Sequence, residues 1–443
     1  MADEKTNTGV AAQKFAVLVG GGPAPGLNGV ISAVTLRALA QGQEVLGLPY
    51  GYSQVMQGKL DGVRSLTAED VRGIHLQGGA ILGTSRANPT KKAEDLGRVV
   101  QSLSELGVTQ LVTIGGDDTA FSAMKVAERA GARLRVVHVP KTIDNDLDLP
   151  AHIDTFGFQT ARHLGAELVA NLLRDARTSG RWYFVVAMGR KAGSLALGIA
   201  KAAGANLAVI PEEFAGQSQG AKVGLDRIAD VLVGAIIKRR AEGGKDGVAV
   251  LAEGLAEIIP ESELHRLGAV ERDEHDHIRL AEIDLGKGLR KLVEERLRAL
   301  GVATSIVSKD IGYELRCADP IPVDIEYTRD LGYCAAQFLI EGGSDAMASI
   351  QEGRFVPIPF STMIDPRTGR TRVRTVDTAS LRYAVARRYM TRLRRDDFAD
   401  PASLAALARA AGLDGPAFEK RFGYVVEDEP AVLPLFAGAG SGA

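Results

Sequence analysis

The chain has 443 residues, a formal net charge of −2 and a pI of about 6.4, and 24% of its residues are charged. This length predicts two or three lobes, and this charge excludes a general attraction to nucleic acid or to membrane phosphates. The sequence contains no run of 18 apolar residues, which is the length that could span a bilayer. Its two cysteines cannot build a disulfide framework, so we expect a cytoplasmic enzyme with a small ligand.

Strands and helices alternate from the beginning of the chain. Apolar runs predict strands over 15–19 and 45–48, with a helix over 27–40 between them. The glycine-rich turn at 20–26 lets the backbone approach an oxyanion, but its two prolines exclude the dinucleotide fingerprint. A second glycine turn, at 78–86, ends in Arg86. We favour phosphate binding there over the commoner role of a solvated surface arginine.

The functional interpretation depends on residues 115–146. A strand over 111–114 leads into a Gly-Gly-Asp-Asp turn and a helix over 120–130, and we expect Pro140 to end the next strand, over 134–139. A lone turn of this kind is equally well explained as an ordinary strand end. Here, however, four carboxylates would crowd one edge of a parallel sheet, where ligands bind, and Mg²⁺ with a phosphate explains such crowding. They belong to Asp117, Asp118, Asp144 and Asp146.

The second half of the chain repeats this alternation. A helix over 155–178, an apolar strand over 182–188 and another over 247–252 are expected, and the last is followed by Glu253, a candidate acceptor for a sugar hydroxyl. A strand over 304–307 precedes a turn at 312–316, and a helix is expected over 324–340. The acidic and histidine-rich run at 271–277 is interpreted as a solvated connection, because no element would hold metal ligands together there.

This alternation predicts an α/β fold of two Rossmann-like, three-layer α/β/α lobes with mostly parallel sheets. We place the first lobe at 1–150 and the second at 151–310. Residues 311–395 are expected to cross back between the lobes, and 396–443 form a C-terminal extension whose Pro-, Gly- and Ala-rich tail is partly disordered.

Seven motifs, in their order and spacing over 15–393, resemble the phosphofructokinase family. They are GGGPAPGLN at Gly20, GTSR at Gly83, GGDDT at Gly115, PKTIDND at Pro140, MGR at Met188, AEG at Ala252 and GYELR at Gly312. ATP-dependent members usually have glycine at the positions of Asp118 and Lys141, so the chain is similar to the diphosphate-dependent branch. The resemblance implies reversible, Mg²⁺-dependent phosphoryl transfer between pyrophosphate and the 1-hydroxyl of fructose 6-phosphate, with the donor in the first lobe and the sugar phosphate in the second.

The resemblance also assigns roles to residues. It implies that Asp144 is the general base, that Lys141 supplies positive charge in the transition state, that Asp118 excludes ATP and that Asp117 holds Mg²⁺. Diphosphate-binding residues are Gly21, Gly22, Arg86, Gly116 and Lys141. Sugar-phosphate ligands are Thr142, Asp144, Asp146, Arg181, Met188, Gly189, Arg190, Glu253, Tyr313 and Arg316. Arg181 would arrive from a neighbouring subunit, so the resemblance implies a homo-oligomer, at least a dimer.

Two positions depart from the ATP-dependent pattern. Tyr313 stands where those members commonly have histidine, as is usual in the diphosphate branch, and Val307 stands where they have a phosphate-binding arginine; Lys309 is a candidate replacement. Four alternatives remain open: an ATP-dependent phosphofructokinase, sedoheptulose 7-phosphate as a main substrate, an NAD or lipid kinase with a similar glycine turn, and a phosphosugar sensor or scaffold without activity.

Overall fold

The computed structural model describes residues 13–150, 152–214, 222–268, 283–367, 371–427 and 429. The chain divides into two compact units: unit 1 comprises Met1–Ala161 and Tyr313–Arg374, and unit 2 comprises Arg162–Gly312 and Thr375–Ala443. The segment that we expected to cross back, 311–395, is thus shared between the units. The run at 271–277 and the end of the C-terminal tail lie outside the described residues. Within the described ranges, no helix has the length and apolar character needed to cross a membrane.

Unit 1 is built on an eight-stranded, mostly parallel sheet with the order β14-β11-β5-β4-β1-β2-β3, and β6 pairs with β5. Only the edge strands β3 and β14 run antiparallel to their neighbours. The strands are β1 (Lys14–Val19), β2 (Glu44–Leu48), β3 (Arg64–Ser65), β4 (Val108–Gly115), β5 (Arg135–Thr142), β6 (Phe156–Gly157), β11 (Ala346–Met347) and β14 (Ile358–Pro359). A small separate hairpin pairs β12 (Ile350–Gln351) with β13 (Arg354–Phe355).

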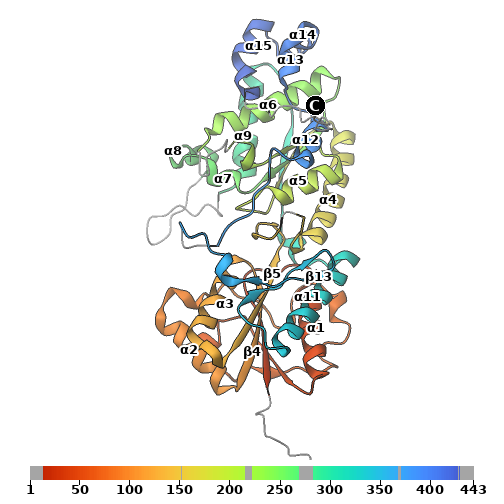
Figure 1. The fold of residues 1–443 in the computed structure, drawn as a ribbon. Coiled ribbons are helices and arrows are strands. Elements are labelled where there is room, and N and C mark those ends of the chain that lie inside the picture. Colours follow the sequence, from red (N-terminus) through yellow and green to blue (C-terminus); the bar gives the residue numbers. More distant parts are fainter. Residues whose placement is uncertain are drawn as a thin grey trace, which may run out of the picture. The chain divides into compact units, whose positions relative to one another are not determined.

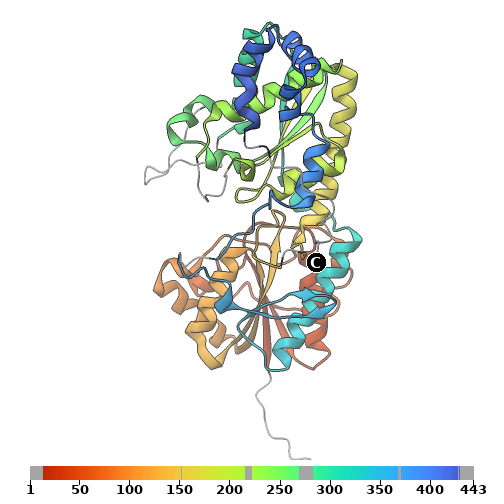
Figure 2. The same cartoon turned by 45° about the horizontal axis from the view of Figure 1, so that its top comes forward.

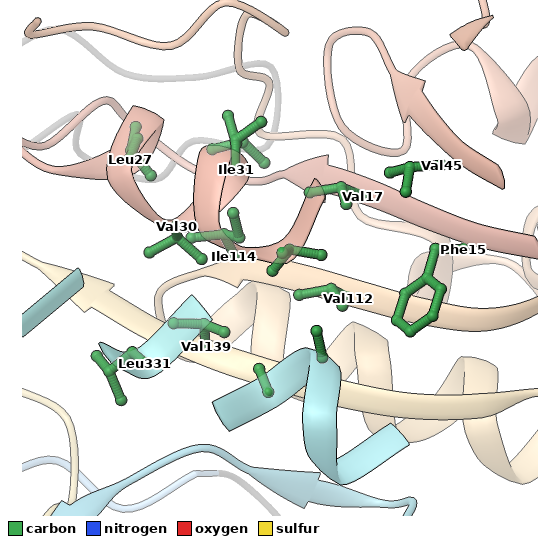
Figure 3. Close-up of a cluster of buried hydrophobic side chains, with 14 of the residues drawn as sticks. Phe15, Val17, Leu27, Val30, Ile31, Val45, Val112, Ile114, Val139 and Leu331 are labelled. Carbon is green, nitrogen blue, oxygen red and sulfur yellow. The ribbon is translucent and has the colours of Figure 1, made fainter. Parts of the chain in front are cut away.

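Helices cover both faces of this sheet (Figure 1). Helices α1 (Leu27–Leu39) and α11 (Pro322–Ile340) pack together on one face, and α2 (Ala93–Glu105) and α3 (Asp117–Ala130) on the other. Because successive side chains of a strand point to opposite faces of the sheet, β1 contributes side chains to the cores on both faces. Phe15 and Val17 join the cluster under α1 and α11 (Figure 3), whereas Ala16 and Leu18 join the cluster under α2 and α3.

Unit 2 contains a four-stranded, fully parallel sheet with the order β10-β7-β9-β8. Its strands are β7 (Trp182–Ala187), β8 (Leu207–Val209), β9 (Gly247–Ala252) and β10 (Ile306–Ile311). Every residue of β7 and β9 is buried, as expected for central parallel strands. Helix α5 (Ser194–Ala203) packs on β8 and β9, α6 (Leu225–Ala241) packs on β9, and α9 (Leu285–Ala299) packs on α6, β7 and β10. Helix α4 (Phe158–Ser179) precedes β7.

Short helices complete unit 2. They are α7 (Leu255–Ile258), α8 (Glu261–Leu264), α12 (Leu381–Arg388), α13 (Arg395–Ala399), α14 (Pro401–Ala410) and α15 (Gly415–Phe422). Asp400 and Asp414 cap the amino ends of α14 and α15 and are followed within two residues by prolines, a combination that fixes where a helix begins. Helices α13 to α15 (deep blue) lie together, and α14 packs against α6 (Figure 2).

The predicted α/β fold with mostly parallel sheets is confirmed, and several local expectations are wrong. Pro140 does not end its strand: β5 continues to Thr142, because Lys141 and Thr142 pair with Phe156 and Gly157 of β6. The expected turn at 312–316 contains a single helical turn, α10 (Tyr313–Arg316).

Candidate functional site

The glycine turns of unit 1 meet where the strand order reverses. Strands β1 and β4 are neighbours, and the chain proceeds from β1 to β2 on one side and from β4 to β5 on the other. Such a switch point leaves a crevice at the carboxyl ends of the two strands, where ligands of open parallel sheets bind. Gly20 and Gly115 lie there; the N–H of Gly20 donates to Ile114 O at 2.8 Å, and that of Gly21 donates to Ser85 O at 2.7 Å. The turn at 78–86, and with it the exposed Arg86, therefore joins the same edge.

Two cations lie against the first glycine turn. Lys141 Nζ donates to Gly22 O at 2.6 Å. A Cβ on Gly22 would fall 1.4 Å from Arg316 Nη2, so this position must be glycine for the guanidinium to pack there. Gly21 has φ 82°, and a Cβ on it would lie 3.4 Å from Lys141 Nζ. The structure thus brings together four residues that the sequence predicted for phosphate binding and sugar-phosphate binding.

The electrostatics of Lys141 suit an anionic ligand. Its side chain is buried, and this burial, reinforced by the nearby Arg316 guanidinium, lowers the pKa of Lys141 to about 8. The carboxylates of Asp144 and Asp146 act in the opposite direction, and Arg86 adds to the lowering. An ammonium that is both desolvated and close to other cations gains more from a bound anion than a surface lysine does.

Asp117 and Asp118 occupy the first turn of α3, which begins three residues earlier than expected. Asp117 Oδ1 accepts the N–H of Asp118 at 2.9 Å, whereas the Asp118 side chain is exposed. Within the described ranges, no three or more His, Cys, Asp or Glu side chains gather as a metal cage. One carboxylate beside a glycine turn that carries two cations does fit Mg²⁺, which commonly takes one or two protein carboxylates together with phosphate and water oxygens.

The next predicted residues lie on the loop after β5. The N–H of Asp144 donates to Thr142 Oγ1 at 3.0 Å, which ties the candidate base to the end of the strand. Asn145, between Asp144 and Asp146, is buried and has φ 57°, a left-handed conformation that asparagine adopts more readily than most residues other than glycine. Its side chain donates to Asp154 Oδ1 at 2.7 Å and accepts the N–H of Thr155 at 3.0 Å. The two carboxylates therefore flank a fixed, unusual backbone position.

His138 lies beneath the same turns and was not anticipated. It is fully buried on β5; Thr113 Oγ1 lies 2.8 Å from its Nδ1, and Gly115 O lies 3.0 Å from its Nε2. Gly115 O can only accept, so Nε2 carries the proton and Nδ1 accepts from the Thr113 hydroxyl. Burial, partly offset by the bond to Gly115, lowers the pKa of His138 to about 3. A neutral imidazole therefore supports the start of the Gly115 turn.

The predicted residues of unit 2 gather at the carboxyl ends of its strands. The N–H of Met188 donates to Ile311 O at 3.0 Å, and Glu253 Oε2 accepts the N–H of Gly189 at 3.2 Å. A Cβ on Gly254 would fall 2.4 Å from Arg190 O, so the turns after β7 and β9 are in contact. Met188, Gly189, Arg190 and Glu253 thus form one cluster, which presents a guanidinium and a carboxylate.

The other predicted positions fall elsewhere. Arg181 directly precedes β7, at the amino end of this strand, whereas Met188 directly follows its carboxyl end. Tyr313 is 79% exposed, and its ring centroid lies 5.6 Å from Arg316 Cζ. Val307 and Lys309 are two residues apart on β10, so their side chains point to the same face of the sheet. The sequence predicted that this strand would end at Val307, whereas it continues to Ile311.

Sequence reasoning missed Asn145, His138 and Arg374. A histidine in an otherwise apolar strand, and an asparagine in a turn, were signals that could have marked the first two. Arg374 bonds to Asn145 across 229 positions of sequence, and no local pattern announces such a contact.

Comparison with known proteins agrees with this arrangement. The sequence profile of the family described as Phosphofructokinase matches residues 14–339. The chain is 51% identical over 421 residues to the pyrophosphate–fructose 6-phosphate 1-phosphotransferase of Thermotoga maritima, covering 94% of this chain and 99% of that protein. It is 49% identical to the protein of the same name from Naegleria fowleri, over 93% and 95% of the two chains.

A solved structure shares the fold. The crystal structure of the pyrophosphate-dependent phosphofructokinase from Nitrosospira multiformis matches with a TM-score of 0.64 at 15% identity, covering 97% of this chain and 95% of that one. The predicted family is thereby confirmed by the sequence profile and by the relatives, and the solved structure confirms the predicted fold. The chain belongs to the phosphofructokinase family.

Proposed function

We propose that this protein moves a phosphoryl group reversibly between pyrophosphate and the 1-hydroxyl of fructose 6-phosphate, giving fructose 1,6-bisphosphate and phosphate. The observation that carries the proposal is the pair of cations, Lys141 and Arg316, packed on the glycine turn at the switch point of unit 1. The names of the Thermotoga maritima and Naegleria fowleri relatives support the same donor and acceptor.

In the proposed mechanism, the diphosphate binds against Gly21, Gly22 and Gly116, with the protonated Lys141 and Arg86 on its oxygens. Asp144 accepts the proton of the sugar 1-hydroxyl as that oxygen attacks the terminal phosphorus, and the bond from this phosphorus to the bridging oxygen breaks to release phosphate. Lys141 offsets the charge that moves onto the departing phosphate. Mg²⁺, held by Asp117 together with phosphate and water oxygens, would neutralise further phosphate charge.

Asp118 selects the donor in this proposal. Its exposed carboxylate stands at the beginning of α3, where a longer donor would place another phosphate. At an effective dielectric of about 20, two unit negative charges about 4 Å apart repel by about 4 kcal/mol, nearly a thousandfold in affinity. Pyrophosphate has no third phosphate to be repelled.

A donor exchange tests this assignment. Initial rates of the wild type with pyrophosphate and with ATP should favour pyrophosphate, and the double variant Asp118→Gly, Lys141→Gly should gain ATP-dependent turnover. Each single variant serves as a control, because neither alone converts both positions. Turnover of the wild type with ATP and not with pyrophosphate would overturn the donor assignment.

Fructose 6-phosphate is the proposed acceptor, and Thr142, Asp144 and Asp146 are among its proposed ligands. Met188, Gly189, Arg190 and Glu253 offer backbone, guanidinium and carboxylate groups to its phosphate and hydroxyls. Sedoheptulose 7-phosphate presents the same reacting end. Measuring kcat/KM for both sugars with pyrophosphate decides between them; a higher value for the seven-carbon sugar would replace fructose 6-phosphate in this proposal.

We further propose a cytoplasmic homo-oligomer, at least a dimer, in which Arg181 serves the sugar site of a neighbouring subunit. The position of Arg181, at the opposite end of β7 from Met188, supports this reading. Mixing inactive Arg181→Ala and Asp144→Ala subunits should restore about a quarter of wild-type activity, because random hybrid dimers contain one intact site. No recovery in mixtures shown by mass spectrometry to contain hybrids would exclude a shared site.

A further inference from the structure

The loop that carries the proposed base is held from a distant part of the chain. Arg374 Nε donates to Asn145 O at 3.1 Å, and Nη2 donates to the Asn145 side-chain oxygen. Nη1 lies 2.7 Å from Ile153 O, 3.3 Å from Pro150 O and 3.5 Å from Leu149 O. One guanidinium thus serves four backbone carbonyls and one amide of a single loop.

The backbone of Arg374 adds to this attachment. Its N–H donates to Asp146 O at 2.9 Å, and the preceding Val373 forms an antiparallel bridge with Leu147. The segment that ends unit 1 therefore binds the loop through main chain and side chain together. Arg374 is only partly exposed, and burial lowers its pKa, although the carboxylates of Asp154 and Asp146 oppose that effect.

The anchor acts on Asn145, which alone among the described residues of the loop has a positive φ. A left-handed conformation is unfavourable for residues other than glycine, although asparagine adopts it more readily than most, and contacts with the surroundings stabilise it. Asn145 has φ 57°, and Arg374 donates hydrogen bonds to both its backbone carbonyl and its side-chain oxygen. The Asn145 side chain also bonds to Asp154 and to the N–H of Thr155. If Asn145 relaxed to negative φ, the chain direction between Asp144 and Asp146 would change, and the two carboxylates would turn relative to each other.

We infer that Arg374 is a positioning residue: it keeps Asn145 left-handed and so sets the geometry of Asp144 and Asp146 for proton transfer. This inference rests on the proposed function for its catalytic consequence, because Asp144 is the base in that proposal. Arg374 itself touches no reacting atom. Lysine cannot replace it, since an ammonium at the end of a flexible chain cannot reach both atoms of Asn145 and the carbonyls from one plane.

The test compares Arg374→Met and Arg374→Lys with Arg372→Met. Arg372 is the matched control, because it lies two residues away and carries the same charge, but its side chain is 51% exposed and forms an ion pair with Asp148 at 3.6 Å. Removing Arg374 should lower kcat about 100-fold, the usual effect of displacing a catalytic group by about 1 Å, with both KM values changed only a few-fold. The lysine variant should lose at least about tenfold, and Arg372→Met should stay within about twofold of wild type.

A second measurement does not depend on turnover. In a crystal structure of Arg374→Met, or of Arg374→Lys if the first variant does not fold, Asn145 should have left the left-handed region. An Asn145 that stays near φ 57° overturns the inference, whatever reaction the wild type performs. It is also overturned if the folded variants keep kcat within twofold of wild type and lose only thermal stability. Absence of pyrophosphate-dependent turnover in the wild type would refute the proposed function instead, and the crystal structure would still decide the role of Arg374.

Discussion

His138 gives the fold a measurable dependence on pH. Its imidazole is fully buried between the Thr113 hydroxyl and the Gly115 carbonyl, and the Lys141 ammonium is the charged group that acts on it. Because burial lowers the pKa of His138 from 6.5 to about 3, the folded protein keeps this ring neutral at pH values where the unfolded chain binds a proton. The stability associated with the neutral ring is therefore intact above pH 6.5 and decreases as the pH falls toward 3.

The size of the effect follows from the two pKa values. Between pH 7 and pH 5 the unfolded histidine takes up nearly one proton and the folded one almost none, so the free energy of unfolding should fall by about 2 kcal/mol, at 1.36 kcal/mol per pH unit below 6.5. The replacement His138→Gln removes the titration and keeps a side-chain amide long enough to donate to Gly115 O.

Urea unfolding of both proteins at pH 7 and pH 5 measures this difference. The wild type should lose about 2 kcal/mol more than His138→Gln over that interval, and the titration of all other groups cancels in the comparison. Equal losses in the two proteins would show that His138 accepts a proton in the folded state over this interval, which would refute the lowered pKa of this buried ring.

Three further predictions concern catalysis. Asp144→Asn should lower kcat by orders of magnitude with little change in substrate binding, measured by steady-state rates and calorimetry, and near-normal turnover would exclude Asp144 as the base. Because the pKa of Lys141 is about 8, kcat/KM for pyrophosphate should fall as the pH rises through 8. This fall should be absent in Lys141→Arg, because arginine stays charged at that pH. The same fall in the variant would show that another group causes it. Gly22→Ala should raise KM for fructose 6-phosphate at least about tenfold, because its Cβ would displace the guanidinium of Arg316, a proposed sugar-phosphate ligand, and unchanged kinetics would remove Arg316 from the site.

The parts of the fold that local patterns encode were predictable from the sequence. Apolar runs marked β1, β4 and β7, and glycine turns after strands marked the switch point of unit 1. Pro140 misled because a proline usually ends a central strand, whereas here Lys141 and Thr142 find a new partner in β6, a pairing that depends on a strand 15 residues further along the chain. Such tertiary pairing overrides a local rule and leaves no mark in the local sequence.

The candidate site divides in the same way. Lys141 and Gly22 belong to recognisable motifs, but their contact, and the packing of Arg316 on Gly22, required the structure. The anchoring of Asn145 by Arg374 lies furthest from sequence reasoning, since the arginine follows no motif and its five acceptors belong to residues 145–153. Residues that touch a ligand tend to sit in motifs, whereas residues that hold those motifs in place are distributed along the chain.

In the proposed function, the charges around the first glycine turn, at 20–26, explain why a small, highly charged phosphoryl donor suits it. Burial disfavours the charge of the Lys141 ammonium most, and the nearby guanidinium groups of Arg316 and Arg86 add to this effect. A diphosphate that entered would reverse both effects at once, because its oxygens would replace lost water and its charge would stabilise the ammonium, raising the pKa of Lys141. Binding at pH 8 should therefore take up a proton, and a neutral or singly charged ligand could not supply the same compensation. In the proposed function, the turn selects its donor by how much charge the donor carries in a small volume, and Asp118 at the start of α3 limits how far that charge can extend.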